Sequence, residues 1–224
     1  MEIQNKLSEI RVEKKSTTKQ NFFSVLSAIT IGMILGLVAK LVDDQGINPI
    51  FDAIGGRLGV WIFVATLIAI FSYSPKLAAF KICSFFVSLL TIYYLYTVFF
   101  LNFFPMREIV FWGMCAVVSP VCAYVMWYAR GNGFLSSAVL ALPITALLSE
   151  GYQLRNAYLP EHTHYYLIPI LMGIYLIMVI ILLIVVPKRR LEFLIVLPIS
   201  IILSLIIIYF NVLGRIFGGL NGVL

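Results

Sequence analysis

Residues 165–186 read YYLIPILMGIYLIMVIILLIVV, a run without a single charged side chain. A helix needs about 20 apolar residues to cross ~30 Å of hydrocarbon, because it rises about 1.5 Å per residue. Lipid offers no partner for unpaired backbone N–H and C=O groups, so a run of this length is helical despite its strand-forming isoleucines and valines. This stretch alone therefore predicts a membrane-spanning helix.

The rest of the chain has the same character. Its 224 residues are 62% hydrophobic and 12% charged, with a mean hydropathy of +1.02. Soluble domains have about 45–50% apolar and about 25% charged residues, so this composition excludes them, and it also excludes disordered, collagen-like and coiled-coil chains. We predict an all-α fold, a polytopic transmembrane helix bundle of about seven spans. The predicted spans are residues 22–42, 58–73, 77–104, 109–128, 134–153, 165–186 and 191–213.

The second and fifth of these runs are short, and a six-span bundle without the second run is the alternative. Eleven of the 16 Lys and Arg residues fall on the side of the amino terminus, four fall on the other side, and Lys40 lies inside a span. Cytoplasmic loops carry the excess of positive charge, which predicts a cytoplasmic N-terminus and, for seven spans, a C-terminus outside. The expected location is the cell (cytoplasmic) membrane, as a multi-pass protein surrounded by lipid.

Three regions follow from this topology. Residues 1–21 form a cytoplasmic basic tail, either a short amphipathic helix on the membrane surface or a frayed end. Residues 22–213 form a single transmembrane helical domain, and residues 214–224 form a Gly-rich C-terminal tail. The positive charges lie between apolar runs and form no basic face interleaved with aromatic residues, so the net charge of +6 does not predict a nucleic-acid partner. Trp127 and Tyr128 are expected in the aromatic belt at the inner interface.

The first span contains a ridge of small residues. Ser24, Ala28, Gly32 and Gly36 follow one another at four-residue steps, which keeps them on one face of a helix. Small side chains at this spacing allow a second backbone to approach closely in membranes. We predict that these four residues form a helix-packing face.

The ridge continues into ionisable residues near the outer end of the span. Lys40 has Asp43 and Asp44 three and four residues further along. A charge inside a membrane costs at least about 2.5–3.5 kcal/mol, so it should be paired or hydrated. Glu150 closes the fifth run and is a second candidate, and a contact between Lys40 and Glu150 is geometrically allowed. We predict a substrate-binding group of Lys40, Asp43, Asp44 and Glu150; the alternative is a snorkelling lysine in a local ion pair.

The sequence contains no strong catalytic or metal-binding motif. Glu161, His162 and His164 include types that bind metals, but two alternating histidines need further ligands, and we favour a hydrated loop over a metal site. The three cysteines lie apart within apolar runs and have no zinc-site spacing. There is no H-E-x-x-H, no calcium loop and no Gly-rich phosphate loop, so we predict no cofactor and no catalytic residue.

Between residues 36 and 153 the chain resembles an uncharacterised family of bacterial polytopic membrane proteins, known as a domain of unknown function. The similar places are Gly59-Val60-Trp61, Tyr93-Tyr94, Phe111-Trp112, Ser119-Pro120 and Ser149-Glu150-Gly151. The resemblance implies a bacterial cytoplasmic membrane, and it carries over no catalytic or binding residue.

Three function classes remain. The leading prediction is a membrane protein that binds or moves a small solute, in the manner of a substrate-capture subunit or transporter. The alternative is a non-catalytic accessory, immunity or interaction subunit, whose ridge docks a membrane-protein partner or a second copy of the chain. The third is a lipid-active membrane enzyme, which would need a convergent acid, base or metal site that the sequence does not supply.

Overall fold

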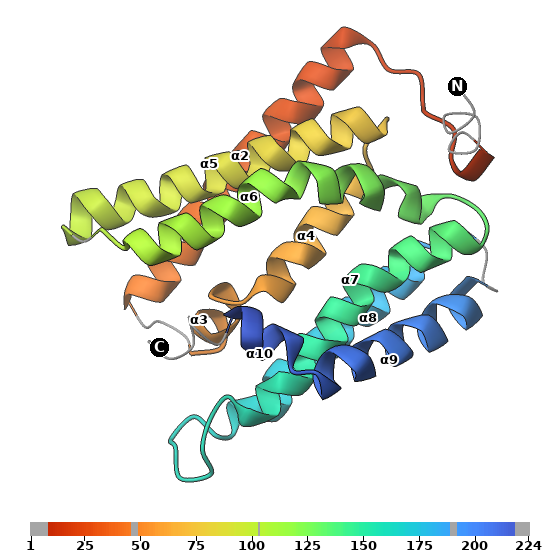
Figure 1. Cartoon of the computed structure of the whole chain (residues 1–224). Helices are drawn as coiled ribbons and strands as arrows, with labels where there is room; N and C mark the ends of the chain where they lie inside the picture. The colour runs from red at the N-terminus through yellow and green to blue at the C-terminus, as the bar shows by residue number, and fades with distance from the viewer. Residues whose placement is uncertain (1–8, 46–48, 103, 189–191, 218–224) are drawn as a thin grey trace. The chain divides into compact units, whose positions relative to one another are not determined.

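The computed structural model describes residues 9–45, 49–102, 104–188 and 192–217. Within these residues every regular element is a helix and none is a strand, which confirms the predicted all-α class (Figure 1). The elements are α2 (Thr18–Gln45), α3 (Pro49–Gly55), α4 (Leu58–Ile70), α5 (Pro75–Leu101), α6 (Met106–Met126), η1 (Trp127–Arg130), α7 (Phe134–Gln153), η2 (Leu154–Asn156), α8 (Leu167–Val185), α9 (Phe193–Tyr209) and α10 (Val212–Phe217).

Five helical segments of the described chain are long and apolar enough to cross a membrane, as expected of a multi-pass membrane protein. They are Thr18–Asp43, Pro75–Leu101, Met106–Arg130, Phe134–Asn156 and Leu167–Val185. The predicted second and seventh runs form the shorter helices α4 and α9, of 13 and 17 residues. The count of seven crossings and the sides of the two termini stay predictions.

One predicted run matches its helix and another does not. The fifth run, predicted at residues 134–153, has the same bounds as α7 and is lengthened by η2, which follows it directly. The seventh run is interrupted after Phe210, where Asn211 has a φ of 48° and α10 begins at the next residue. Asparagine tolerates this left-handed conformation better than other residues with a side chain, which explains why the helix ends there.

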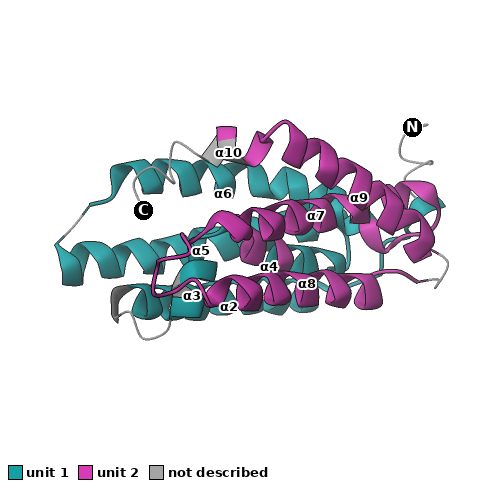
Figure 2. Ribbon diagram, turned by 90° about the horizontal axis from the view of Figure 1, so that it is seen from below, with its two compact units in different colours: residues 1–57, 64–128 teal, residues 58–63, 129–224 magenta. Residues whose placement is uncertain are grey.

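The chain divides into two compact units, coloured separately in Figure 2. The first contains residues 1–57 and 64–128, and the second contains residues 58–63 and 129–224. The division falls inside α4, so the first six residues of this helix count with the second unit. Each unit has its own set of packed helices.

In the first unit, α5 contacts both α2 and α6. The side chains of Ala28, Ile82 and Phe85 are buried in its core. A capping box begins α2: the Thr17 hydroxyl accepts the N–H of Gln20 at 3.3 Å, and the Gln20 side-chain oxygen accepts the N–H of Thr17 at 2.9 Å. Helix α2 therefore begins within the predicted tail of residues 1–21, and residues 11–17 before it are not helical.

In the second unit, α7 contacts both α8 and α9. Hydroxyl groups join α7 to α9: Ser200 donates to the carbonyl oxygen of Ala141 at 3.5 Å, and Thr145 donates to the carbonyl oxygen of Ser200 at 3.4 Å. Such short polar side chains allow helices to approach closely and to hydrogen-bond across the contact in lipid.

Candidate functional site

The predicted ridge on α2 lies against α5 of the same chain. Gly32 and Gly36 are buried, and the hydroxyl of Ser88 on α5 donates to the carbonyl oxygen of Ile29 on α2 at 3.1 Å. A methyl group added at Gly32 would lie 2.5 Å from the carbonyl oxygen of Phe85, and one added at Gly36 would lie 3.1 Å from the Cα of Leu89. Glycine is required at both positions because the two backbones approach this closely. The ridge therefore has a partner inside the chain.

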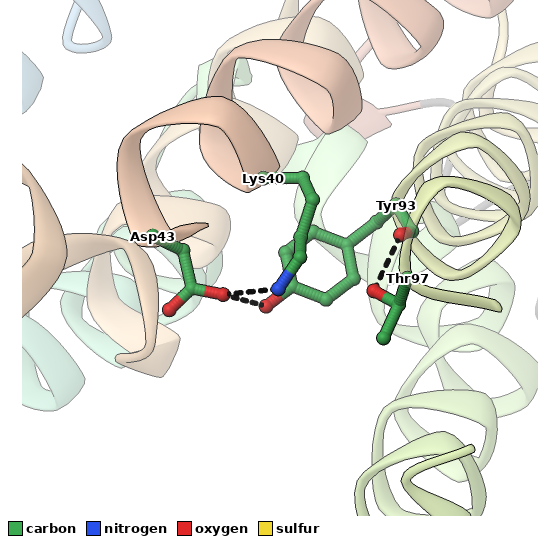
Figure 3. A network of polar contacts seen from close by, with 4 residues as sticks. All are labelled: Lys40, Asp43, Tyr93 and Thr97. Carbon is green, nitrogen blue, oxygen red and sulfur yellow. Dashed lines mark hydrogen bonds and ion pairs between the residues drawn. The ribbon is translucent and has the colours of Figure 1, made fainter. Parts of the chain in front are cut away.

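Lys40 ends the ridge in a local network, shown in Figure 3. Its ammonium lies 2.7 Å from the carboxylate of Asp43, three residues along the same helix, and 5.0 Å from the ring centroid of Tyr93 on α5. The Tyr93 hydroxyl donates to the same carboxylate oxygen at 2.8 Å, and the Thr97 hydroxyl donates to the Tyr93 carbonyl oxygen at 2.9 Å. The Lys40 side chain is 8% exposed and that of Asp43 is 41% exposed. This is the local ion pair of the alternative prediction, with a cation–π contact added.

The group was also predicted to contain Asp44 and Glu150. The side chain of Asp44 is outside the described residues. Glu150 is in the second unit, whereas Lys40 is in the first, and the hydrogen-bond partners described for each belong to its own unit. The structure thus describes Lys40 with Asp43 in the first unit and Glu150 in the second, and the group of four stays a prediction.

Glu150 on α7 caps the beginning of α4. Its carboxylate accepts the backbone N–H groups of Leu58 at 3.1 Å and Gly59 at 2.5 Å, and the hydroxyl of Tyr175 on α8 at 3.1 Å. Arg57, at the N-cap position of α4, makes no capping hydrogen bond with its own side chain. The first N–H groups of a helix have no partner within it and carry a partial positive charge, so a carboxylate from another helix is a favourable partner.

Glycine is required next to this carboxylate. A methyl group added at Gly59 would lie 2.5 Å from both a Glu150 carboxylate oxygen and a ring carbon of Tyr175. A methyl group added at Gly151 would lie 3.0 Å from the Cβ of Tyr175. Glu150 is the one residue of this site that could be singled out from the sequence, because the N–H groups of Leu58 and Gly59 are backbone donors without a sequence signature.

The predicted metal candidates lie in the exposed loop before α8. The ring centroids of His162 and His164 are 5.2 Å apart, and that of Tyr158 stacks 5.0 Å from His162. The Nδ1 atom of His162 accepts the backbone N–H of His164 at 3.1 Å. In the described part of the chain, no three His, Cys, Asp or Glu side chains come together as a metal site would require, and this includes Glu161.

Sequence reasoning missed the burial of Arg11. Arg11, in the non-helical segment before α2, is 8% exposed. Its guanidinium donates to the carbonyl oxygens of Ile70 at 2.8 Å and of Trp127, and it stacks over the Trp127 ring with 4.0 Å from Cζ to the centroid. Trp127 is fully buried, so its ring is covered by the protein and does not face lipid. The one available signal was an arginine among the lysines of the tail.

Comparison with known proteins gives a family and no function. A family model described as a family of unknown function (DUF6518) matches residues 15–215, a longer part of the chain than the resemblance noted between residues 36 and 153. No curated protein matches the chain. No solved structure matches it either.

Proposed function

The chain belongs to DUF6518, a family of unknown function, and we propose that it is a multi-pass protein of the cytoplasmic membrane that binds or moves a small, positively charged solute at Glu150. The supporting observation is the carboxylate of Glu150, held between the amino end of α4 and the hydroxyl of Tyr175. We thus keep the prediction of a solute-binding protein, and we place the binding site at Glu150 in place of Lys40.

The length of α4 supports this role. Its 13 residues span only about 20 Å, less than the ~30 Å of hydrocarbon in a bilayer. A helix of this length that begins within the membrane exposes backbone N–H groups that lipid cannot satisfy, and Glu150 supplies acceptors for two of them. Discontinuous helices whose ends hold ionic groups are a common feature of solute sites in transporters.

The charge of Glu150 indicates the class of solute. Neither α4 nor α8 contains a charged residue, and Tyr175 is the only titratable side chain in α8. A cation that approached Glu150 would compete with the N–H donors of α4 for its oxygens, and binding would then loosen the start of this helix. A proton would compete with the cationic solute for the same carboxylate oxygens. Intramembrane carboxylates commonly mark ion and substrate pathways.

The topology in this proposal has the N-terminus inside and the C-terminus outside, as the distribution of Lys and Arg predicts. Five crossings by the long helices and seven crossings that include α4 and α9 both give an odd number. Reporter fusions at the two termini test it, and a result with both termini on one side contradicts it.

Thermal unfolding in detergent tests the solute site. We expect cationic metabolites to raise the melting temperature of the wild-type protein, and we expect this rise to disappear in Glu150→Gln. Glu161→Gln is the matched control, because it removes the same charge from the exposed loop before α8. An absence of any rise across a broad panel contradicts the proposal, as does a full response in Glu150→Gln.

A second candidate function is an interaction subunit, and one observation favours it. The α2 ridge is occupied by α5, but α6 has an exposed apolar stripe at helical spacing, formed by Val110, Met114, Val117, Val121 and Val125. Cys122 is exposed on the same helix. Oxidative crosslinking in native membranes should then give a dimer or a heterodimer that Cys122→Ser abolishes, and recovery of monomer alone removes this candidate.

A further inference from the structure

We propose that the carboxyl ends of α4 and α6, together with the face of Trp127, form a binding site for a guanidinium cation, and that Arg11 of the amino-terminal segment occupies this site as a tethered, displaceable ligand. Every residue of the site belongs to the first unit. The proposal is independent of the solute site at Glu150 and goes beyond it.

The acceptors come from two helix ends. Ile70 is the last residue of α4, and Trp127 directly follows the last residue of α6. Carbonyl groups in the last turn of a helix lack partners within it and carry a partial negative charge. The guanidinium of Arg11 donates to the carbonyl oxygen of Ile70 at the end of α4 and to that of Trp127, where α6 passes into η1. The end of α4 and the junction of α6 with η1 therefore offer two oxygen acceptors to one cation.

The aromatic wall has support besides Arg11. The indole N–H of Trp127 donates to the carbonyl oxygen of Ser72 at 2.8 Å, and the Tyr128 ring makes an edge contact at 5.1 Å. Neither of these contacts involves Arg11. A cation stacked on the face of a tryptophan is attracted by the ring's quadrupole, and the attraction is stronger where water is excluded.

The geometry favours a planar guanidinium over an ammonium. A guanidinium presents a rigid fork of donors and a flat face, so it can reach both carbonyls while it stacks on the ring. An ammonium is a compact, strongly hydrated charge, and it pays more to leave water while making a less directed contact. The site thus selects for shape as well as for charge.

The segment that carries Arg11 lies outside the helices, and only Thr17 at its end takes part in the cap of α2. Residues 11–17 are not helical, and the side chains of residues 12–15 are exposed. The backbone N–H of Lys14 donates to the carbonyl oxygen of Tyr73 at 3.0 Å, which is the backbone tie described for this stretch. Tethering gives Arg11 an effective concentration on the order of millimolar, so a free ion meets a competitor in the wild-type protein.

Titration of the full-length Arg11→Ala variant with methylguanidinium chloride tests the proposal, with the melting temperature in detergent as the readout. We expect a saturable rise in Arg11→Ala and an apparent Kd at least about tenfold higher in the wild-type protein, where Arg11 competes. Lys15→Ala is the matched control: it removes the same charge from the same segment, and it should behave like the wild type.

Methylammonium chloride at the same concentrations controls for ionic strength and charge, and it should bind Arg11→Ala about tenfold more weakly or not at all. If Arg11→Ala is recovered folded only when methylguanidinium is present during purification, the proposal is supported. It is overturned if methylguanidinium gives no saturable rise, if methylammonium acts equally well, or if the variant stays unfolded with methylguanidinium present.

Discussion

Replacing Gly36 by alanine tests the packing of α2 on α5 most directly. The added methyl group would lie 3.1 Å from the Cα of Leu89 and closer still to its carbonyl oxygen. Nonbonded heavy atoms prefer separations of about 3.5–4.0 Å, so α5 would have to move away by up to about 1 Å. Because the neighbour is backbone, no side-chain rotation relieves the overlap. Overpacking of this kind typically costs about 1–3 kcal/mol.

Alanine also favours a helix over glycine by about 1 kcal/mol, which partly offsets the clash. Gly113→Ala, on α6, is the matched control, because nothing lies within 4 Å of its added methyl group. The helix-propensity gain cancels between the two variants, so their difference measures the clash alone. At about 2–4 °C per kcal/mol for a chain of this size, we expect Gly36→Ala to unfold several degrees below Gly113→Ala in detergent. Equal melting temperatures would refute the close approach of α2 and α5.

Two other substitutions test whether Glu150 or Lys40 forms the solute site. Gly59→Ala should displace the carboxylate of Glu150 or the ring of Tyr175 and lower the free energy of unfolding by about 1–3 kcal/mol. It should also abolish the response to cationic solutes in the thermal assay. An unchanged response would show that this carboxylate is not the solute site. Lys40→Met keeps the apolar stem of the buried side chain and leaves Asp43, which is 41% exposed, able to be hydrated; we expect a loss of about 1 kcal/mol with the solute response intact. A Lys40→Met variant that unfolds or loses the response would return the solute site to Lys40.

The helical class could be predicted because lipid imposes it. A long uncharged run has one way to satisfy its backbone groups, so composition and run length suffice. The same logic does not fix the ends or the number of crossings: the run 191–213 gives no warning that Asn211 adopts a left-handed conformation and ends α9. The ridge spacing indicates that some backbone approaches Gly32 and Gly36, but spacing alone cannot say whether that backbone belongs to α5 or to another chain.

The sites were predictable only where they are local. Lys40 and Asp43 are three residues apart on one helix, so their pairing follows from helical geometry. The contact of Glu150 with Gly59 joins residues 91 apart, and the donor is a backbone group without a sequence signature. Arg11 and the Trp127 carbonyl are 116 residues apart. Neither contact leaves a pattern in one sequence, because backbone donors and acceptors occur at almost every position.

The cap on α4 has a consequence for biosynthesis. The carboxylate that satisfies the start of this helix is 92 residues downstream of Leu58 in the chain, so ribosomes complete α4 long before Glu150 is made. A segment of 13 residues with unsatisfied amide groups is a poor candidate for immediate transfer from the translocon into lipid. We expect α4 to wait at the insertion machinery until α7 emerges, and nascent chains arrested before Glu150 should leave it accessible to water-soluble labels.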